Sequence, residues 1–338
     1  MHRQFSLAAS VAALCLLPGV AFAAPQVVAS VKPIHSLVAS VMKGVGEPAL
    51  IVEGGASPHT YSMKPSNARA LESADVVFWV GSGLEAFLDK PLEALAGDAK
   101  VVELEDVDGL RKLPFREGGA FEAHDHGEGE HAHGSHDDHD HAGHDHGHDA
   151  HAEDSGHEHH EGDGHSHGGS DMHLWLDPNN ASLMAKAIAV TLSEADPDNA
   201  ATYAENLKAL QAELTALDDE IRNTLAPTAG KRAVVFHDAY QYFETHYGLR
   251  IAGSITVSPE TMPGAERLSE IKAKIAELDV ACVFAEPQFD TRLVEVVTAG
   301  TNAKIGTLDP EGATFEPGAA LYSDLMRKLA TSAAECMG

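Results

Sequence analysis

The sequence predicts an α/β fold with two lobes, each a mostly parallel sheet flanked by helices, joined by one long backbone helix. In both halves, short β-branched runs alternate with amphipathic segments, which is typical of parallel sheets covered on both faces. Between the halves, an amphipathic stretch of about 28 residues predicts a rod of roughly 40 Å. The chain has 338 residues. That length allows two domains of roughly 150 residues each.

The first lobe is expected at residues 24–192. Val27 to Val31 is a β-branched run after a proline, so it predicts the first strand. Ile34 to Met42 has apolar residues at helical spacing and predicts the first helix. The alternation continues with strands expected at 49–52, 76–80 and 101–104, and with helices expected at 67–73 and within 81–96.

A tract rich in histidine and acidic residues interrupts this lobe at residues 117–170. From Glu117 to Asp171 the chain has 16 Asp or Glu, 16 His and no Lys or Arg. The tract supplies more than half of the net charge of −29, and that sign disfavours nucleic-acid binding. With few apolar residues, the tract cannot offset the entropy of ordering, and we expect it to be disordered without metal.

A solvated acidic linker would explain the acids of this tract but not one histidine for each acid. The composition therefore predicts an accessory loop that binds a soft or borderline cation. Its candidate ligands are His124, His126, His131, His133, His136, His139, His141, His144, His146, His148, His151, His157, His159, His160, His165 and His167.

Residues 193–227 are expected to form the linking helix. Asp196-Pro-Asp198 is a typical helix start, apolar positions recur from Tyr203 to Ile221, and Pro227 ends the pattern. The second lobe is expected at residues 228–338. Its strands are expected at 233–236, 252–257, 280–285 and 303–308, and its helices at 239–247, 266–278, 290–299 and 322–334.

Residues 1–23 predict a cleaved signal peptide. A short basic start is followed by an apolar run from Leu7 to Leu17 and by Ala21-Phe-Ala23, the small-x-small pattern of a cleavage site. The apolar run is too short to span a bilayer, which takes roughly 20 residues. We therefore expect a periplasmic protein whose mature chain begins near Ala24, and no later segment predicts a membrane span.

Export also bears on the cysteines. Once Cys15 leaves with the signal peptide, Cys282 and Cys336 remain, an even pair in an oxidising compartment. We predict that they form one disulfide that fixes the C-terminal tail to the second lobe. The alternative is two unrelated buried thiols.

Five histidines lie outside the tract and the signal peptide: His35, His59, His173, His237 and His246. His59 and His237 each follow a predicted strand, and His173 precedes an Asp-Pro break. In open α/β sheets, ligands bind beyond the carboxyl ends of strands. Converging imidazoles there would form a zinc site. Taken singly, each histidine is more often a hydrogen-bonded or surface residue than a metal ligand.

Several short motifs occur in order along the chain. They are Pro58-His-x-Tyr61, Lys64-Pro-Ser66, Ala74-Asp-Val-Val-Phe-Trp-Val-Gly81, Leu84-Glu85, His173-Leu-Trp-Leu-Asp-Pro178, Phe236-His-Asp-Ala-Tyr-Gln-Tyr-Phe243, Ser258-Pro-Glu260, Phe284-Ala-Glu-Pro-Gln288 and Gly306-Thr-Leu-Asp-Pro310. Together they resemble the metal-binding periplasmic proteins of ABC importers, the cluster A-I metal solute-binding family. The charged histidine-rich loop is similar to that of the subgroup serving high-affinity zinc importers.

The resemblance implies two Rossmann-like lobes with Zn²⁺ bound in the cleft between them. By motif, His59 and His173 are the ligands from the first lobe, and His237 is the ligand from the second. Asp309 matches the aspartate that completes manganese-type sites, and water or a neighbouring carboxylate is the alternative fourth ligand. The family's late cysteine pair matches Cys282 and Cys336, in agreement with the predicted disulfide.

Two differences between this chain and members of the family bear on the identity of the metal. Manganese-type relatives have Glu at the position of His237, and imidazole in place of a carboxylate favours zinc. Some zinc-type relatives have an acid before the first histidine, where this chain has Pro58.

Glu103, Glu286 and Asp238 are candidates for orienting the imidazole rings. We expect His35 to be structural and His246 to lie at the surface.

The resemblance implies that the protein captures Zn²⁺ and delivers it to a membrane ABC permease. We expect it to be a monomer and not an enzyme. A periplasmic zinc chaperone as a further partner stays open, as does the role of the tract as a collector of zinc or as a sensor. A zinc hydrolase is an alternative, because three histidines with an open fourth position are also a catalytic layout, but no His-Glu-x-x-His motif supports it. A manganese or iron importer protein is another.

Overall fold

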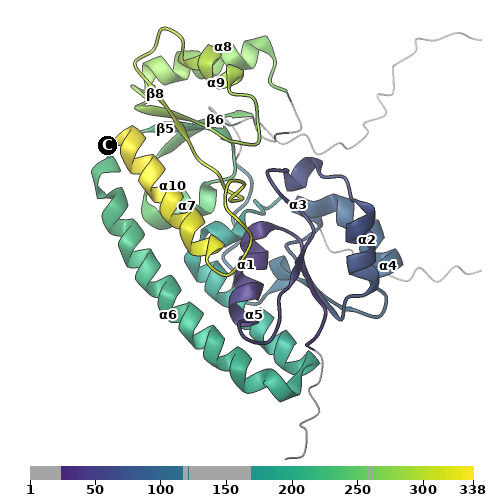
Figure 1. Cartoon of the computed structure of the whole chain (residues 1–338). Coiled ribbons are helices and arrows are strands. Elements are labelled where there is room, and N and C mark those ends of the chain that lie inside the picture. The colour runs from purple at the N-terminus through teal and green to yellow at the C-terminus, as the bar shows by residue number, and fades with distance from the viewer. Residues whose placement is uncertain (1–23, 117–120, 122–168, 257–258, 260–261) are drawn as a thin grey trace, which may run out of the picture.

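A computed structural model describes residues 24–116, 121, 169–256, 259 and 262–338 of the chain (Figure 1). The predicted signal peptide, the sixteen tract histidines and two residues of the Ser258–Glu260 motif lie outside the described residues. Within the described ranges, no helix is both long and apolar enough to cross a membrane.

The first half forms a sheet of four parallel strands in the order β2-β1-β3-β4. The strands are β1 (Val27–Ala29), β2 (Ala49–Leu50), β3 (Val76–Trp79) and β4 (Lys100–Glu103). The helices of this half are α1 (Lys32–Val41), α2 (Pro65–Glu72), α3 (Ser82–Glu85) and α4 (Asp89–Leu95). The central strands β1 and β3 are buried throughout, which explains their continuous apolar runs.

The second half forms another sheet of four parallel strands, in the order β6-β5-β7-β8. Its strands are β5 (Ala233–His237), β6 (Ile251–Thr256), β7 (Cys282–Ala285) and β8 (Lys304–Thr307). Its helices are α7 (Gln241–Tyr247), α8 (Ala265–Glu277), α9 (Arg292–Thr298) and α10 (Leu321–Met337). Counted within its own half, each sheet has the strand order 2-1-3-4, so the similar rhythm of the two halves reflects a shared topology.

The long helix α6 (Ala200–Leu225) runs along one side of both sheets, beside α5 and α10 (Figure 1). Its buried face includes Leu210, Leu214 and Leu217. One hydrophobic cluster extends from Phe78 in the first sheet through Leu214 to Phe284 in the second. A second cluster covers the other face of the second sheet. These features confirm the predicted fold class of two α/β lobes and one long helix.

The predictions omit α5 (Pro178–Ala195), which precedes the long helix. The local signals for it are present in the sequence. The carboxylate of Asp177 accepts a hydrogen bond from the backbone N–H of Asn179 at 2.9 Å, and Pro178 occupies the first helical position. Met184, Ile188 and Leu192 then form a buried face at helical spacing.

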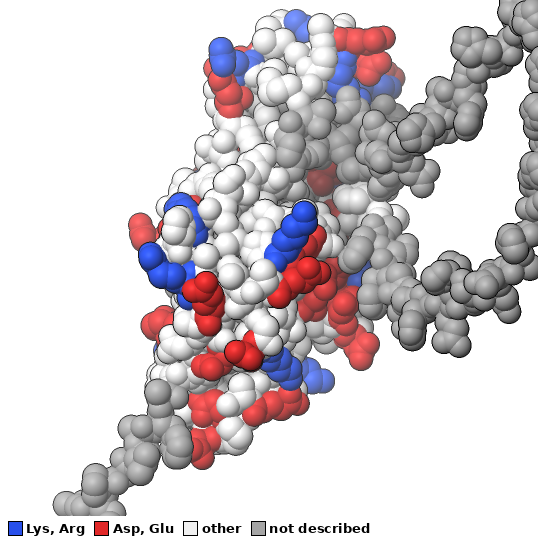
Figure 2. Space-filling model, turned by 90° about the vertical axis from the view of Figure 1, so that its right-hand side faces the viewer, with Lys and Arg blue, Asp and Glu red and all other residues white. Residues whose placement is uncertain are grey.

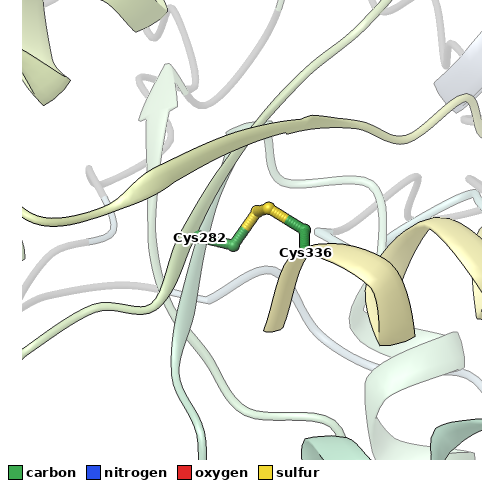
Figure 3. Close-up of a disulfide and its surroundings, with 2 residues drawn as sticks. All are labelled: Cys282 and Cys336. Carbon is green, nitrogen blue, oxygen red and sulfur yellow. A yellow bond between two sulfur atoms is a disulfide. The ribbon is translucent and has the colours of Figure 1, made fainter. Parts of the chain in front are cut away.

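The predicted disulfide is confirmed. Cys282 in β7 is bonded to Cys336 in α10, with the two Cα atoms 5.8 Å apart (Figure 3). The bond joins residues 54 positions apart and ties the C-terminal helix to a central strand of the second sheet. It therefore fixes the tail to the second lobe, as expected from the sequence.

The expectation that His246 lies at the surface is wrong. Its side chain is only 7% exposed, and its ring nitrogen atoms lie 3.2 Å from a carboxylate oxygen of Asp177 and 2.8 Å from one of Asp218. Burial lowers the pKa of His246, but hydrogen bonds and charge attraction from these two carboxylates outweigh it and raise the pKa above its usual value. His246 thus joins α7 to the start of α5 and to α6.

We predict that His246 stabilises the fold in its protonated form. Because its pKa is raised on folding, this contribution is complete below about pH 6.5 and is lost as pH rises through the folded-state pKa. His246→Asn should cost roughly 1 kcal/mol at pH 6, after solvent screening, and less at pH 9. The measurement is thermal unfolding in chelator, taken as the difference between wild type and variant at each pH.

His35 provides a matched control for this pH series. Its ring Nε2–H donates to the backbone oxygen of Pro48 at 3.0 Å, and burial lowers its pKa. Stability from His35 is therefore lost as pH falls, so the difference for His35→Asn should shrink towards acid pH. A destabilisation by His246→Asn that grows between pH 6 and pH 9 would contradict the assignment.

Candidate metal centre

His59 lies in the loop between β2 and α2, within a single turn of 3-10 helix (Pro58–Thr60). The turn is held in place by Tyr61, whose hydroxyl donates to the backbone oxygen of Ile51 at 2.8 Å and also lies 3.1 Å from Oδ1 of Asn67. The side-chain amide of Asn67 donates to the same Ile51 oxygen at 3.2 Å. These bonds direct the loop beyond the carboxyl end of the first sheet.

His173 lies directly before another 3-10 turn, Leu174–Leu176, which leads into α5. The turn is anchored by Trp175, whose indole N–H donates to the backbone oxygen of Pro310 at 2.9 Å. The hydroxyl of Tyr322 in α10 donates to the backbone oxygen of Trp175 at 2.8 Å. Segments of the second lobe therefore fix the position of a histidine that belongs to the first.

His237 is the last residue of β5 and is 4% exposed. The strand order of the second sheet reverses between β5 and β7, so this edge is the topological switch point where open α/β sheets bind ligands. Glu286 follows β7 at the same edge, and its carboxylate lies 2.7 Å from Nδ1 of His237. The sheet itself therefore pairs this imidazole with a carboxylate.

The three histidines come together. One ring nitrogen from each of His59, His173 and His237 lies within 4.8 Å of the others, and the ring centroids are 5.3–5.7 Å apart. No other group of three or more His, Cys, Asp or Glu side chains in the described part of the chain meets this criterion. Three segments far apart in sequence thus build one compact nitrogen cluster.

Carboxylates fix the orientation of two of these rings. Nδ1 of His173 lies 2.8 Å from a carboxylate oxygen of Asp171, and Nδ1 of His237 lies 2.7 Å from one of Glu286. Because a carboxylate only accepts hydrogen bonds, each Nδ1 carries its proton and each Nε2 is left with a lone pair when the ring is neutral. This arrangement is the one that metal-binding histidines use.

The Nε2 atoms of His173 and His237 face each other at 3.4 Å. Two lone pairs at this separation repel unless a proton or a cation lies between them. Two imidazole nitrogens bound to one tetrahedral Zn²⁺ at 2.0–2.1 Å are separated by about 3.3–3.4 Å. The observed spacing therefore fits zinc without rearrangement of these two rings.

The pKa shifts in the cluster follow from burial and charge. Burial lowers the pKa of His59 well below its usual value, and the neighbouring rings of His173 and His237 lower it further. Burial also acts to lower the pKa of His237, but the Glu286 carboxylate outweighs it and raises the pKa overall. A proton held at His237 would occupy the place of a metal ion.

Other expected partners of the imidazoles are placed elsewhere. Of the three acids expected to orient the rings, Glu286 does so, whereas the backbone N–H of Ser82 donates to Glu103 at 3.4 Å, and Asp238 binds Arg116. Asp171 orients the ring of His173, a role that the sequence analysis does not assign to it, because it is the last of the many acids in the tract. The Asp-x-His spacing is the sequence feature that could have indicated this role.

Asp309, the expected fourth ligand, is not part of the cluster. Its Oδ1 accepts hydrogen bonds from the side-chain amide of Gln288 at 2.9 Å and from the backbone N–H of Glu311 at 3.1 Å. His35 also lies apart from the cluster, bound to the backbone of Pro48 as expected of a structural residue. The structure therefore unites three of the four metal residues predicted from the sequence.

The residues that flank the tract meet beside this cluster. The backbone N–H of Phe115 donates to the oxygen of Gly169 at 2.8 Å, and that of Asp171 donates to the oxygen of Leu113 at 2.9 Å. Arg116 forms ion pairs across to Asp238 and Glu244, next to His237 in the second lobe.

The surface charge also suits a cation. Asp and Glu side chains gather on the face of the molecule that Figure 2 shows, with fewer Lys and Arg among them. A negative field of this kind raises the local concentration of cations and disfavours anionic ligands.

Comparisons with known proteins agree with the geometry. A model of the ZnuA family, described as zinc-uptake complex component A, periplasmic, matches residues 27–336. The high-affinity zinc uptake system protein ZnuA of Brucella abortus (strain 2308) is 51% identical over 339 residues, covering 100% of this chain and 98% of the relative. The protein of that name from Paracoccus denitrificans (strain Pd 1222) is 42% identical over 315 residues, covering 93% of this chain and 92% of the relative.

Solved structures share the fold. A crystal structure of ZnuA superposes with a TM-score of 0.70 at 24% identity, covering 93% of this chain and all of the other. The periplasmic zinc-binding protein TroA of Treponema pallidum superposes with a TM-score of 0.71 at 20% identity, covering 93% and 99%. The fold, the family match over residues 27–336 and the extensive identity to curated relatives confirm the resemblance seen in the sequence: the chain belongs to the ZnuA family of periplasmic zinc-uptake components.

Proposed function

We propose that the protein captures Zn²⁺ in the cleft between its lobes with His59, His173 and His237, and delivers it to the membrane permease of a high-affinity zinc ABC importer. The family is that of the periplasmic zinc-binding component of a zinc-uptake complex, which supports both the cargo and the compartment. The observation that carries the site assignment is the pair of Nε2 atoms 3.4 Å apart, each on a ring held by a carboxylate.

The ligand set favours zinc over harder cations. Imidazole suits zinc, whereas manganese is better served by carboxylate and carbonyl oxygens. The three clustered ligands here are all imidazoles. Because protons compete for the same lone pairs, zinc binding is expected to weaken as pH falls towards about 6.5.

The family role argues against a zinc hydrolase, because the family is that of a component of a zinc-uptake complex. The sequence also has no His-Glu-x-x-His motif, which many zinc hydrolases use. Asp171 and Glu286, two carboxylates beside the cluster, are both engaged by the Nδ1 atoms of the rings. We therefore propose a binding protein and not an enzyme, acting as a monomer whose partner is the permease.

We predict that His59→Ala, His173→Ala and His237→Ala each weaken tight zinc binding by more than the roughly 10–100-fold typical of losing a hydrogen-bond partner of a ligand. Each change removes a nitrogen donor from the cluster. The measurement is zinc titration against a competing chelator, starting below one equivalent so that the tight site fills first.

His35→Ala is the matched control, since it removes another buried histidine that lies outside the cluster. It should leave tight binding unchanged. Tight binding that survives in all three cluster variants would show that the metal is held elsewhere in the chain.

We also propose a role for the histidine-rich tract: it either collects zinc at weaker sites or senses zinc and thereby changes transport by the importer. Many weak ligands tethered close to the cleft raise the local zinc concentration there. Deletion of residues 120–169 should lower the total number of zinc ions bound while leaving the affinity of the tight site unchanged.

Zinc uptake by cells carrying the deletion, measured under zinc scarcity, separates the two roles of the tract. Slower zinc loading of the deleted protein indicates a collector, and unchanged loading with altered transport indicates a sensor. If neither loading nor transport changes, both roles are wrong.

A further inference from the structure

We propose that the carboxylate of Glu311 faces the fourth position of the zinc site, where it binds the ion or the water molecule bound to it. The role rests on zinc binding by the three histidines proposed above. Glu311 lies in the loop after β8 and lines a small cavity together with His59, His237 and Glu286. The cavity therefore adjoins two of the three nitrogen donors.

The polar side chains of this cavity present buried acceptor atoms. Oε1 of Glu311, Oε2 of Glu286 and Oε1 of Gln288 are all buried, and none has a hydrogen-bond donor among the described residues. Buried polar atoms in proteins are almost always satisfied. The buried hydroxyl of Ser57 lines the same cavity and also lacks a partner among the described residues. A cavity whose lining carries three such acceptors and one hydroxyl suits a cation, or the O–H groups of water bound to one.

The charge around Glu311 points to the same conclusion. Glu311 is 7% exposed, and Asp309, Glu85 and Glu286 lie close enough to act on it by electrostatic repulsion. Burying carboxylates together is costly unless bound protons or another positive charge neutralise them. A divalent ion beside the histidines would supply that charge.

The nearby buried cation, Lys32, attracts Glu311 but has its hydrogen bonds elsewhere. Lys32 in α1 is 4% exposed, but its ammonium group donates to three backbone oxygens, those of Gly312, Ala313 and Phe315, at 2.9–3.2 Å. These bonds hold the loop that carries Glu311 against the first lobe. Lys32 therefore positions the loop, and its hydrogen bonds go to backbone oxygens instead of to the carboxylates.

Glu311 fits the fourth position better than Asp309 does. Asp309 has one buried oxygen without a protein donor, but its other oxygen is fixed by two hydrogen bonds. It also lines a different cavity, with Leu308, Phe315 and Leu329. The remaining place for a carboxylate, before the first histidine, is taken by Pro58.

The test compares Glu311→Gln with Asp309→Asn, each of which removes a charge and keeps the shape of the side chain. Glu311→Gln should weaken zinc binding by about 10–100-fold in chelator competition on the full chain, and Asp309→Asn should weaken it much less. Without zinc, Glu311→Gln should unfold at a higher temperature than wild type, because burial disfavours the ionised form of Glu311 and glutamine cannot ionise. Added zinc should then raise that temperature less than it does in wild type.

A merely structural role for Glu311 would not give this pairing of a more stable metal-free protein with weaker zinc binding. A loss of affinity in Asp309→Asn but not in Glu311→Gln would overturn the proposal, and so would equal affinity in both variants. His237→Ala distinguishes a failure of the role of Glu311 from a failure of the zinc site itself. If His237→Ala weakens binding but Glu311→Gln does not, only the role of Glu311 fails; if neither does, the proposed zinc site fails.

Discussion

Two imidazole nitrogens facing each other at 3.4 Å are the contact on which the rest of this structure depends. His173 and His237 belong to different lobes, and each is held by a carboxylate that keeps its Nε2 lone pair directed inwards. The resulting repulsion is relieved only by a proton or a metal ion between the rings. Ion pairs from Arg116 to Asp238 and Glu244 join the lobes beside this contact. The contacts that hold the two lobes together therefore lie beside the two imidazole rings.

Strands, helices and a disulfide hold the histidines in these positions. Parallel strands end at the same edge of each sheet, and that edge faces the other lobe. A residue in the loop after β2 and the last residue of β5 therefore meet although they are far apart in sequence. The hydrophobic cluster that crosses both lobes along α6 fixes their separation. The disulfide from Cys282 to Cys336 secures α10, whose Tyr322 supports the turn after His173. In the proposed zinc site, selectivity for a borderline cation follows from the three nitrogen donors.

The sequence was sufficient to predict the alternation of strands and helices, the disulfide and the convergence of the three histidines, because each depends on local patterns or on recognisable motifs. It was insufficient where contacts between distant segments decide the outcome. His246 follows a short helix and has no local sign of burial, yet Asp177 and Asp218 enclose it. Asp171 was obscured by the composition of the tract next to it. The position of Glu311 depends on where Lys32 holds its loop, which no sequence pattern shows.

The most direct test of the central claim is X-ray absorption at the zinc edge, on full-length protein loaded with less than one equivalent of zinc. The three-histidine site predicts a four-coordinate ion with three imidazole nitrogens and one oxygen at about 2.0–2.1 Å, and loss of one imidazole in His237→Ala. A six-coordinate shell dominated by oxygen, or a spectrum that does not change in His237→Ala, would show that the facing histidines are not the primary zinc site.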